Sequence, residues 1–80
     1  MPHVLVKVAA GHPFAARDAL AGRIVDAVID TLGSTADEVS VAIQGVPAGD
    51  WMAVVYEPEI AAQADLLVKR PGYGSLATPS

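Results

Sequence analysis

Apolar and polar residues alternate over the first part of the chain. Between His3 and Ala9 (HVLVKVA) the odd positions His3, Leu5 and Lys7 share one face. The even positions, which are all valine, share the other. A period of two is typical of a β-strand, because successive side chains point to opposite faces of a sheet. The pattern predicts a strand over residues 3–9 with one apolar face.

The period changes to that of a helix after this strand. Gly11, His12 and Pro13 interrupt the alternation, and Pro13 suits the first turn of a helix. One helical face then collects the apolar residues Leu20, Ile24, Val25, Val28, Ile29 and Leu32, and the opposite face collects Asp18, Gly22, Asp26 and Asp30. An amphipathic helix is predicted over residues 13–32, with Gly33 just past its end.

Alternation returns between Val39 and Gly45. Val39, Val41 and Ile43 form an apolar face, and small or polar residues lie between them. This predicts a second strand. Two strands joined by one long helix form a β-α-β unit, in which the strands are parallel and the crossover is right-handed. The expected fold class is therefore α/β.

The rest of the chain carries weaker patterns. The apolar segment from Trp51 to Tyr56 predicts a short third strand. A second helix is expected to begin at Pro58 and to stop at Pro71 and Gly72. Its apolar stripe comprises Ile60, Ala64, Leu67 and Val68. Residues 74–80 are rich in Gly, Ser and Pro and are expected to form a flexible tail, which leaves an ordered domain over residues 1–73.

Composition adds an expectation about assembly. The chain has 80 residues, 52% of them hydrophobic, and no cysteine. A chain of this length buries only a modest share of its surface and usually needs disulfides, metal or partner subunits for stability. Since disulfides are excluded, we expect an obligate oligomer.

Charge and hydropathy narrow the class of partner. The net charge of −4 disfavours a nucleic-acid partner, which would require a basic surface. No apolar run approaches the ~20 residues of a membrane span, and no signal region is visible at the start, so we expect a cytoplasmic protein with no membrane partner. An anionic substrate would depend on the few cations, which are Lys7, Arg17, Arg23, Lys69 and Arg70.

The chain carries no common catalytic motif. A nucleophile elbow, a phosphate-binding glycine loop and a metal-ligand cluster are all missing from the sequence, and two histidines are too few to predict a metal site. Pro2 is the exception. If Met1 is removed, Pro2 becomes a secondary amine whose pKa falls towards neutrality beside an apolar pocket, where a general base works best. The alternative is that Pro2 only stiffens an exposed terminus.

Several stretches in this order resemble the 4-oxalocrotonate tautomerase family. They are Met1-Pro2-His3, Ser40 to Gln44 (SVAIQ), Trp51, Glu59-Ile60-Ala61 and Lys69 to Tyr73 (KRPGY). The resemblance spans about residues 1–73. It implies a cofactor-free isomerase with a tautomerase-type β-α-β fold, which moves a proton within small enol or 2-keto acids such as phenylenolpyruvate.

The resemblance also implies roles for single residues. Pro2 matches the family's catalytic base, and Trp51 matches the aromatic wall that keeps the pocket dry. His12 and Ser40 match two positions at which many members carry arginines that bind substrate. Because neither residue carries a permanent charge, we expect a preference for less charged acids, or help from Lys7 or the Lys69-Arg70 pair.

Alternatives remain open for three of these residues. Trp51 can serve only in packing, Ser40 can be an ordinary satisfied hydroxyl, and His12 can simply precede the helix. The resemblance implies a homodimer whose strand pairs join in one sheet, with a hexamer as the second possibility. The alternative function is a weak or inactive relative that keeps the fold as a small-molecule binding or interaction module.

Overall fold

The computed structural model describes residues 1–77 of the chain. It comprises two compact units, Met1–Pro47 and a second unit that begins at Ala48. Among the described residues, no helix has both the length and the apolar character needed to cross a membrane.

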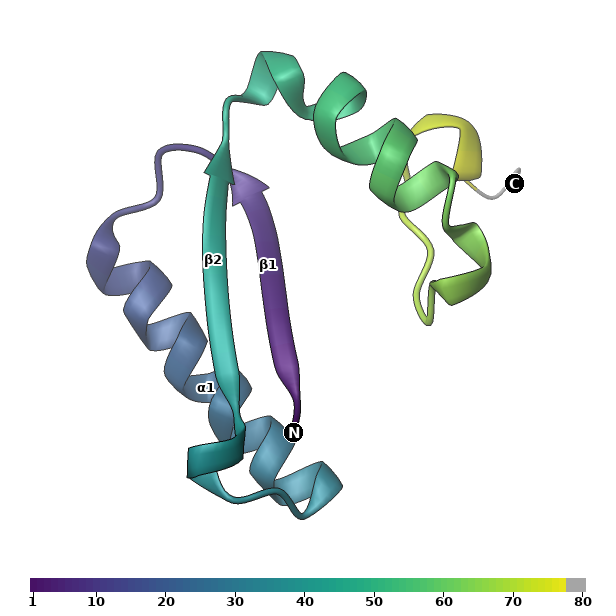
Figure 1. Ribbon diagram of the computed structural model, residues 1–80. Helices are drawn as coiled ribbons and strands as arrows, with labels where there is room; N and C mark the ends of the chain where they lie inside the picture. Colours follow the sequence, from purple (N-terminus) through teal and green to yellow (C-terminus); the bar gives the residue numbers. More distant parts are fainter. Residues whose placement is uncertain (78–80) are drawn as a thin grey trace. The chain divides into compact units, whose positions relative to one another are not determined.

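The first unit is the predicted β-α-β arrangement. Strand β1 (His3–Ala9) is followed by helix α1 (Phe14–Leu32), the short 3-10 helix η1 (Ala36–Glu38) and strand β2 (Ser40–Val46). The two strands pair in parallel, so that His3 lies opposite Ser40 and Ala9 lies opposite Val46. Figure 1 shows the strands side by side, pointing the same way, with α1 along them. The predicted parallel topology is confirmed.

One face of this sheet is partly covered and the other is open. The even-numbered valines of β1, together with Val41 and Ile43 of β2, are half-buried, as are Ile24, Val25, Val28 and Ile29 of α1. On the opposite sheet face His3, Ser40 and Ala42 are exposed, and half of the Leu5 surface remains accessible (51%). The alternation therefore identified the covered face correctly.

Both ends of α1 are formed by the residues that the sequence suggested. Pro13 occupies the N-cap with an extended backbone (φ −68°, ψ 155°), and its carbonyl accepts hydrogen bonds from the N–H groups of Ala16 and Arg17. Gly33 adopts the left-handed conformation (φ 72°) and donates its N–H to the Ile29 carbonyl over 3.0 Å. A residue without Cβ takes this conformation at low cost, which explains the stop.

The predicted third strand is wrong. Residues Met52–Ala61 form a π-helix, η3, which includes most of the apolar segment expected to be a strand. A short apolar run lacks the alternation that distinguishes a strand from a buried helix, and two adjacent residues of this run, Val55 and Tyr56, are both buried.

The predicted bounds of the second helix are also wrong. The helix begins at Met52, before Pro58, and ends at Ala61, where the N–H of Ala62 bonds to the Glu57 carbonyl and the N–H of Gln63 bonds to the Ile60 carbonyl. A single 3-10 turn, Ala64–Leu66, follows it. Val68, expected on the apolar stripe, is fully exposed, whereas the other stripe residues Ile60, Ala64 and Leu67 are half-buried.

The second unit is organised around Tyr56. Its buried hydroxyl donates to the Tyr73 carbonyl over 3.0 Å and accepts the Leu76 N–H over 2.8 Å. Gly74 (φ 69°) lies so close to this ring that a Cβ at position 74 would overlap it. Gly74–Leu76 forms a 3-10 turn. The remainder of the expected flexible tail, residues 78–80, lies outside the described residues.

Candidate active site

Pro2 lies directly before β1 and is half-buried. Its carbonyl accepts a hydrogen bond from the Ser40 N–H over 3.2 Å, so the pairing of the two strands already starts at Pro2. Met1 precedes it with a nearly fully exposed side chain, and its α-amino nitrogen lies 3.9 Å from Oε2 of Glu38. In this form the Pro2 nitrogen is part of an amide and cannot act as a base.

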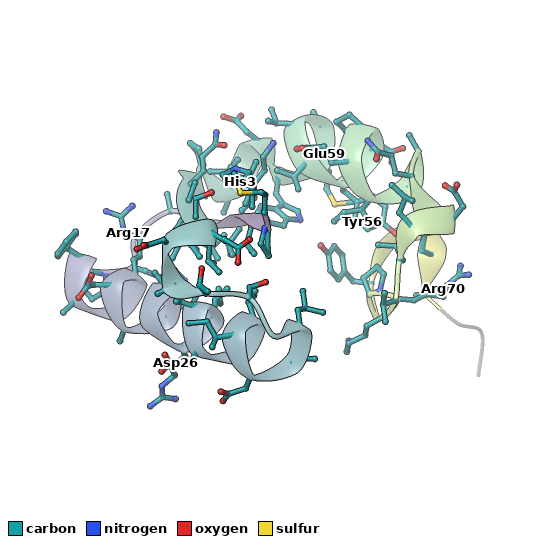
Figure 2. The ribbon with its side chains drawn as sticks, turned by 60° about the horizontal axis from the view of Figure 1, so that its bottom comes forward. His3, Arg17, Asp26, Tyr56, Glu59 and Arg70 are labelled. Carbon is teal, nitrogen blue, oxygen red and sulfur yellow. The ribbon has the colours of Figure 1, made fainter. Side chains whose placement is uncertain are left out.

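Ser40 is the sequence-predicted residue that the structure brings beside Pro2. Its Oγ lies 2.6 Å from Nδ1 of His3, the residue after Pro2, and both side chains are exposed on the open sheet face. His3 is labelled in Figure 2. The family resemblance implies no role for His3 at this site. The signal that could have revealed it is the parallel register, which places His3 opposite Ser40.

A carboxylate lies at the same end of the strands. Oε1 of Glu38 accepts hydrogen bonds from the Thr35 N–H over 3.0 Å and from the Thr35 hydroxyl over 3.1 Å. These bonds, the backbone one first, stabilise the charged form and hold the pKa of Glu38 below its ordinary value of 4.5. A fixed negative charge therefore faces the N-terminal end of the chain.

His12 lies at the other end of β1. It borders a hollow of about 200 Å³ that is lined by Val8, His12, Ala16, Arg17, Leu20 and Ile43. The seven residues of β1 span roughly 20 Å at ~3.3 Å per residue, so a small substrate cannot touch Pro2 and His12 of the same chain. The structure of one chain does not bring these two predicted residues together.

Trp51 belongs to the second unit. It is half-buried at the N-cap of η3, and its Nε1–H donates to the Tyr73 hydroxyl over 2.8 Å. Its indole N–H therefore has a partner within the unit. The structure describes Trp51 only within that unit, so its role beside Pro2 stays a prediction.

The described residues also limit the chemistry available. Across residues 1–77, no cluster of three or more His, Cys, Asp or Glu side chains has the arrangement needed to hold a metal ion. The groups gathered at the start of β1 are an imino acid, a hydroxyl, an imidazole and a carboxylate. Once the proline nitrogen is free, such a set can accept, donate and relay protons.

Known proteins resemble this chain over nearly its whole length. The family model described as tautomerase enzyme matches residues 2–56. A probable tautomerase of Xylella fastidiosa (strain 9a5c) is 46% identical over 79 residues, covering 99% of this chain and 96% of the relative. Tautomerase PptA of Enterobacter sp. (strain 638) is 39% identical over 77 residues, covering 91% of this chain and 97% of the relative.

The fold agrees with the sequence relatives. The crystal structure of apo unfused 4-OT superimposes with a TM-score of 0.57 at 32% identity, covering 59% of this chain and 81% of that chain. The resemblance drawn from Met1-Pro2-His3 and the stretches after it is confirmed by these matches, and the chain belongs to the tautomerase family.

Proposed function

We propose that this protein is an isomerase that interconverts the enol and keto forms of small acids such as phenylenolpyruvate, with Pro2 as the proton carrier. Membership of the tautomerase family supports the class of reaction. The observation that supports the proposal is the position of Pro2. It directly precedes β1, and its carbonyl accepts a hydrogen bond from the Ser40 N–H. A proton acceptor there lies next to a hydroxyl that can contact the substrate oxygen.

The reaction needs two proton movements at one nitrogen. The Pro2 amine takes the proton from the enol hydroxyl, which gives an enolate whose oxygen becomes the carbonyl when the electron pair of the carbon–carbon double bond forms a C–H bond at the adjacent carbon. The resulting ammonium then delivers a proton to the adjacent carbon, which restores the amine. Atoms and charges balance without a cofactor, because the enol and keto forms are isomers.

Ser40 is proposed to stabilise the substrate oxygen during these steps. When His3 donates through Nδ1 to the Ser40 oxygen, the hydroxyl hydrogen of Ser40 is free to bond to the developing carbonyl. Trp51 is proposed as the apolar cover that excludes water and favours the neutral amine.

Assembly is part of the proposal. Pro2 and His12 lie at opposite ends of β1, so we place the His12 side chain of a second copy beside Pro2. A homodimer whose strand pairs join in one sheet is proposed, with a hexamer as the alternative. A cytoplasmic location is proposed with it.

The test replaces Pro2 with Ala and measures phenylenolpyruvate ketonisation. The expected loss in kcat is about two to four decades, the range attributed to a positioned general base. Pro47→Ala, in an exposed connection, is the matched control and should retain activity. Equal activity of Pro2→Ala and the control, or an inactive wild type, counts against the proposal.

A measurement of the intact mass of the protein distinguishes the isomerase from the non-catalytic alternative. A chain that retains Met1 has an amide at Pro2 and fits a binding or interaction module. A chain that has lost Met1 has the free amine that the isomerase requires.

A further inference from the structure

Arg17 combines a permanent charge with an unsatisfied buried donor. It lies in the N-terminal half of α1 (Figure 2), and its Nε is buried with no hydrogen-bond partner among residues 1–77. Buried N–H groups nearly always have a partner, so an orphan at a charged side chain needs an explanation. A bound anion would supply one, because guanidinium groups bind carboxylates through paired hydrogen bonds.

The hollow beside Arg17 suits a small apolar acid. Arg17 and His12 are its polar residues, and the remaining lining residues named above are apolar. Its volume of about 200 Å³ is below the roughly 300–1,000 Å³ of sites for drug-sized ligands. An apolar wall around a charge strengthens the attraction for an anion. A carboxylate attached to a compact hydrocarbon group matches both parts of this lining.

The charges near Arg17 do not cancel the attraction of this region for an anion. Asp18 follows Arg17 and lines an adjacent hollow that Arg17 also borders, but no ion pair joins the two in the part of the chain that the structure describes. The first turn of α1 contains no acidic residue, so the positive end of the helix dipole is not neutralised there. Despite the net charge of −4, this region favours an anion.

We propose that Arg17 binds the carboxylate of the substrate in this hollow and supplies the permanent charge that His12 lacks. The identity of the acid rests on the proposed isomerase function, whereas the preference for an anion rests on Arg17 itself. The protein would then select monocarboxylic acids with an apolar body over their neutral analogues.

A binding experiment tests this without any turnover. The purified protein, labelled with ¹⁵N, is titrated with 3-phenylpropanoate and with the neutral 3-phenylpropanamide while the side-chain Nε–H signal of Arg17 is observed. The acid should shift this signal saturably and bind more tightly than the amide. Arg17→Gln should weaken acid binding about ten- to a hundredfold, the usual effect of losing a hydrogen bond to a charged group. Arg23→Gln, exposed on the same helix, should bind like the wild type.

Two further results keep the outcome decisive. Arg17→Lys keeps the charge and should recover part of the affinity, which a purely structural role of Arg17 would not produce. Equal binding by the Arg17→Gln and Arg23→Gln variants, or equal binding of acid and amide, overturns the proposal.

Turnover then separates this proposal from the isomerase function. Arg17→Gln should raise KM for phenylenolpyruvate more than it lowers kcat. If Pro2→Ala stays active while acid binding depends on Arg17, the isomerase mechanism fails and the anion site stands. If Pro2→Ala is inactive while Arg17→Gln binds the acid normally, the anion site fails and the isomerase stands.

Discussion

At the scale of single residues, the pair formed by His3 and Ser40 is the contact on which the proposed oxygen stabilisation depends. The 2.6 Å contact between Nδ1 and Oγ holds the serine oxygen in place. A hydroxyl held in place by a neighbour contributes more to a transition state than a freely rotating one, because it needs no reorganisation during the reaction.

We expect the two side chains to act as one unit. Ser40→Ala should lower kcat/KM for ketonisation by about tenfold, which corresponds to the loss of one hydrogen bond of roughly 1.4 kcal/mol. His3→Ala should lower it to a similar extent, and the double variant should be little worse than either single one. Steady-state kinetics on the three variants measure this coupling. Effects that simply multiply would show that the contact has no part in catalysis.

Glu38 gives a residue-scale expectation about pH. Because its pKa is lowered in the folded state by the Thr35 hydrogen bonds, its charged form stabilises the fold. This contribution is present at pH values above the ordinary pKa of 4.5 and is lost as the pH falls through the lower folded pKa. Glu38→Gln should therefore be less stable than the wild type at pH 7, and the difference should shrink towards pH 3.

Urea denaturation at the two pH values measures this difference. The neighbouring Asp37→Asn is the control, and it should not reproduce the pH-dependent gap. A gap for Glu38→Gln that stays constant between pH 7 and pH 3 would refute the assigned cause of the pKa shift.

At the scale of elements, Gly22 within α1 and Gly33 at the C-terminal end of α1 have opposite roles. Gly22 is exposed within the helix, and a Cβ there would meet nothing within 4 Å. Gly33 ends the helix with a positive φ of 72°. Gly22→Ala should stabilise the protein by about 0.5–1 kcal/mol through helix propensity, and Gly33→Ala should cost about 1–2 kcal/mol.

The two glycine variants control for each other, because both add one methyl group to the same element. Urea unfolding followed by far-UV circular dichroism measures them. Equal effects of the same sign would contradict the C-cap assignment of Gly33.

The elements also show which parts of the structure a sequence pattern can predict. The strand over His3–Ala9 and the helix that ends at Leu32 were predicted at those residues, because a long periodic pattern fits only one type of element and a glycine marks the end of the helix. The segment Met52–Ala61 was not, because a short apolar run fits a strand or a helix, and because Pro58, which is typical of a helix start, lies inside the helix. The link between His3 and Ser40 depends on strand register, which alternation alone does not give.

At the scale of the whole molecule, the exposed apolar surface bears on assembly. Large hydrophobic side chains that remain accessible in one chain include Leu5, Phe14, Leu20, Leu32, Met52, Val54, Leu66 and Val68. Single exposed hydrophobic side chains are ordinary on a protein surface. So many of them in an 80-residue chain lead us to expect that subunits associate. The proposed site leads to the same expectation of association, because Pro2 and His12 lie at opposite ends of β1 and can meet one substrate only if they come from different subunits.

Sedimentation equilibrium tests the assembly. We expect a species of about twice the chain mass of 8.2 kDa, or six times that mass for a hexamer, across micromolar concentrations. A protein that stays monomeric and still ketonises the substrate would show that one chain suffices, and the proposed role of His12 from a second copy would be wrong.

The measurement that tests the central claim most directly is a pH titration of the Pro2 nitrogen by ¹⁵N NMR on the purified protein. The proposal predicts the resonance of a free secondary amine with a titration midpoint near neutrality, since the nitrogen must exchange a proton under working conditions. A resonance typical of an amide that does not titrate, or a midpoint far into the alkaline range, would contradict it.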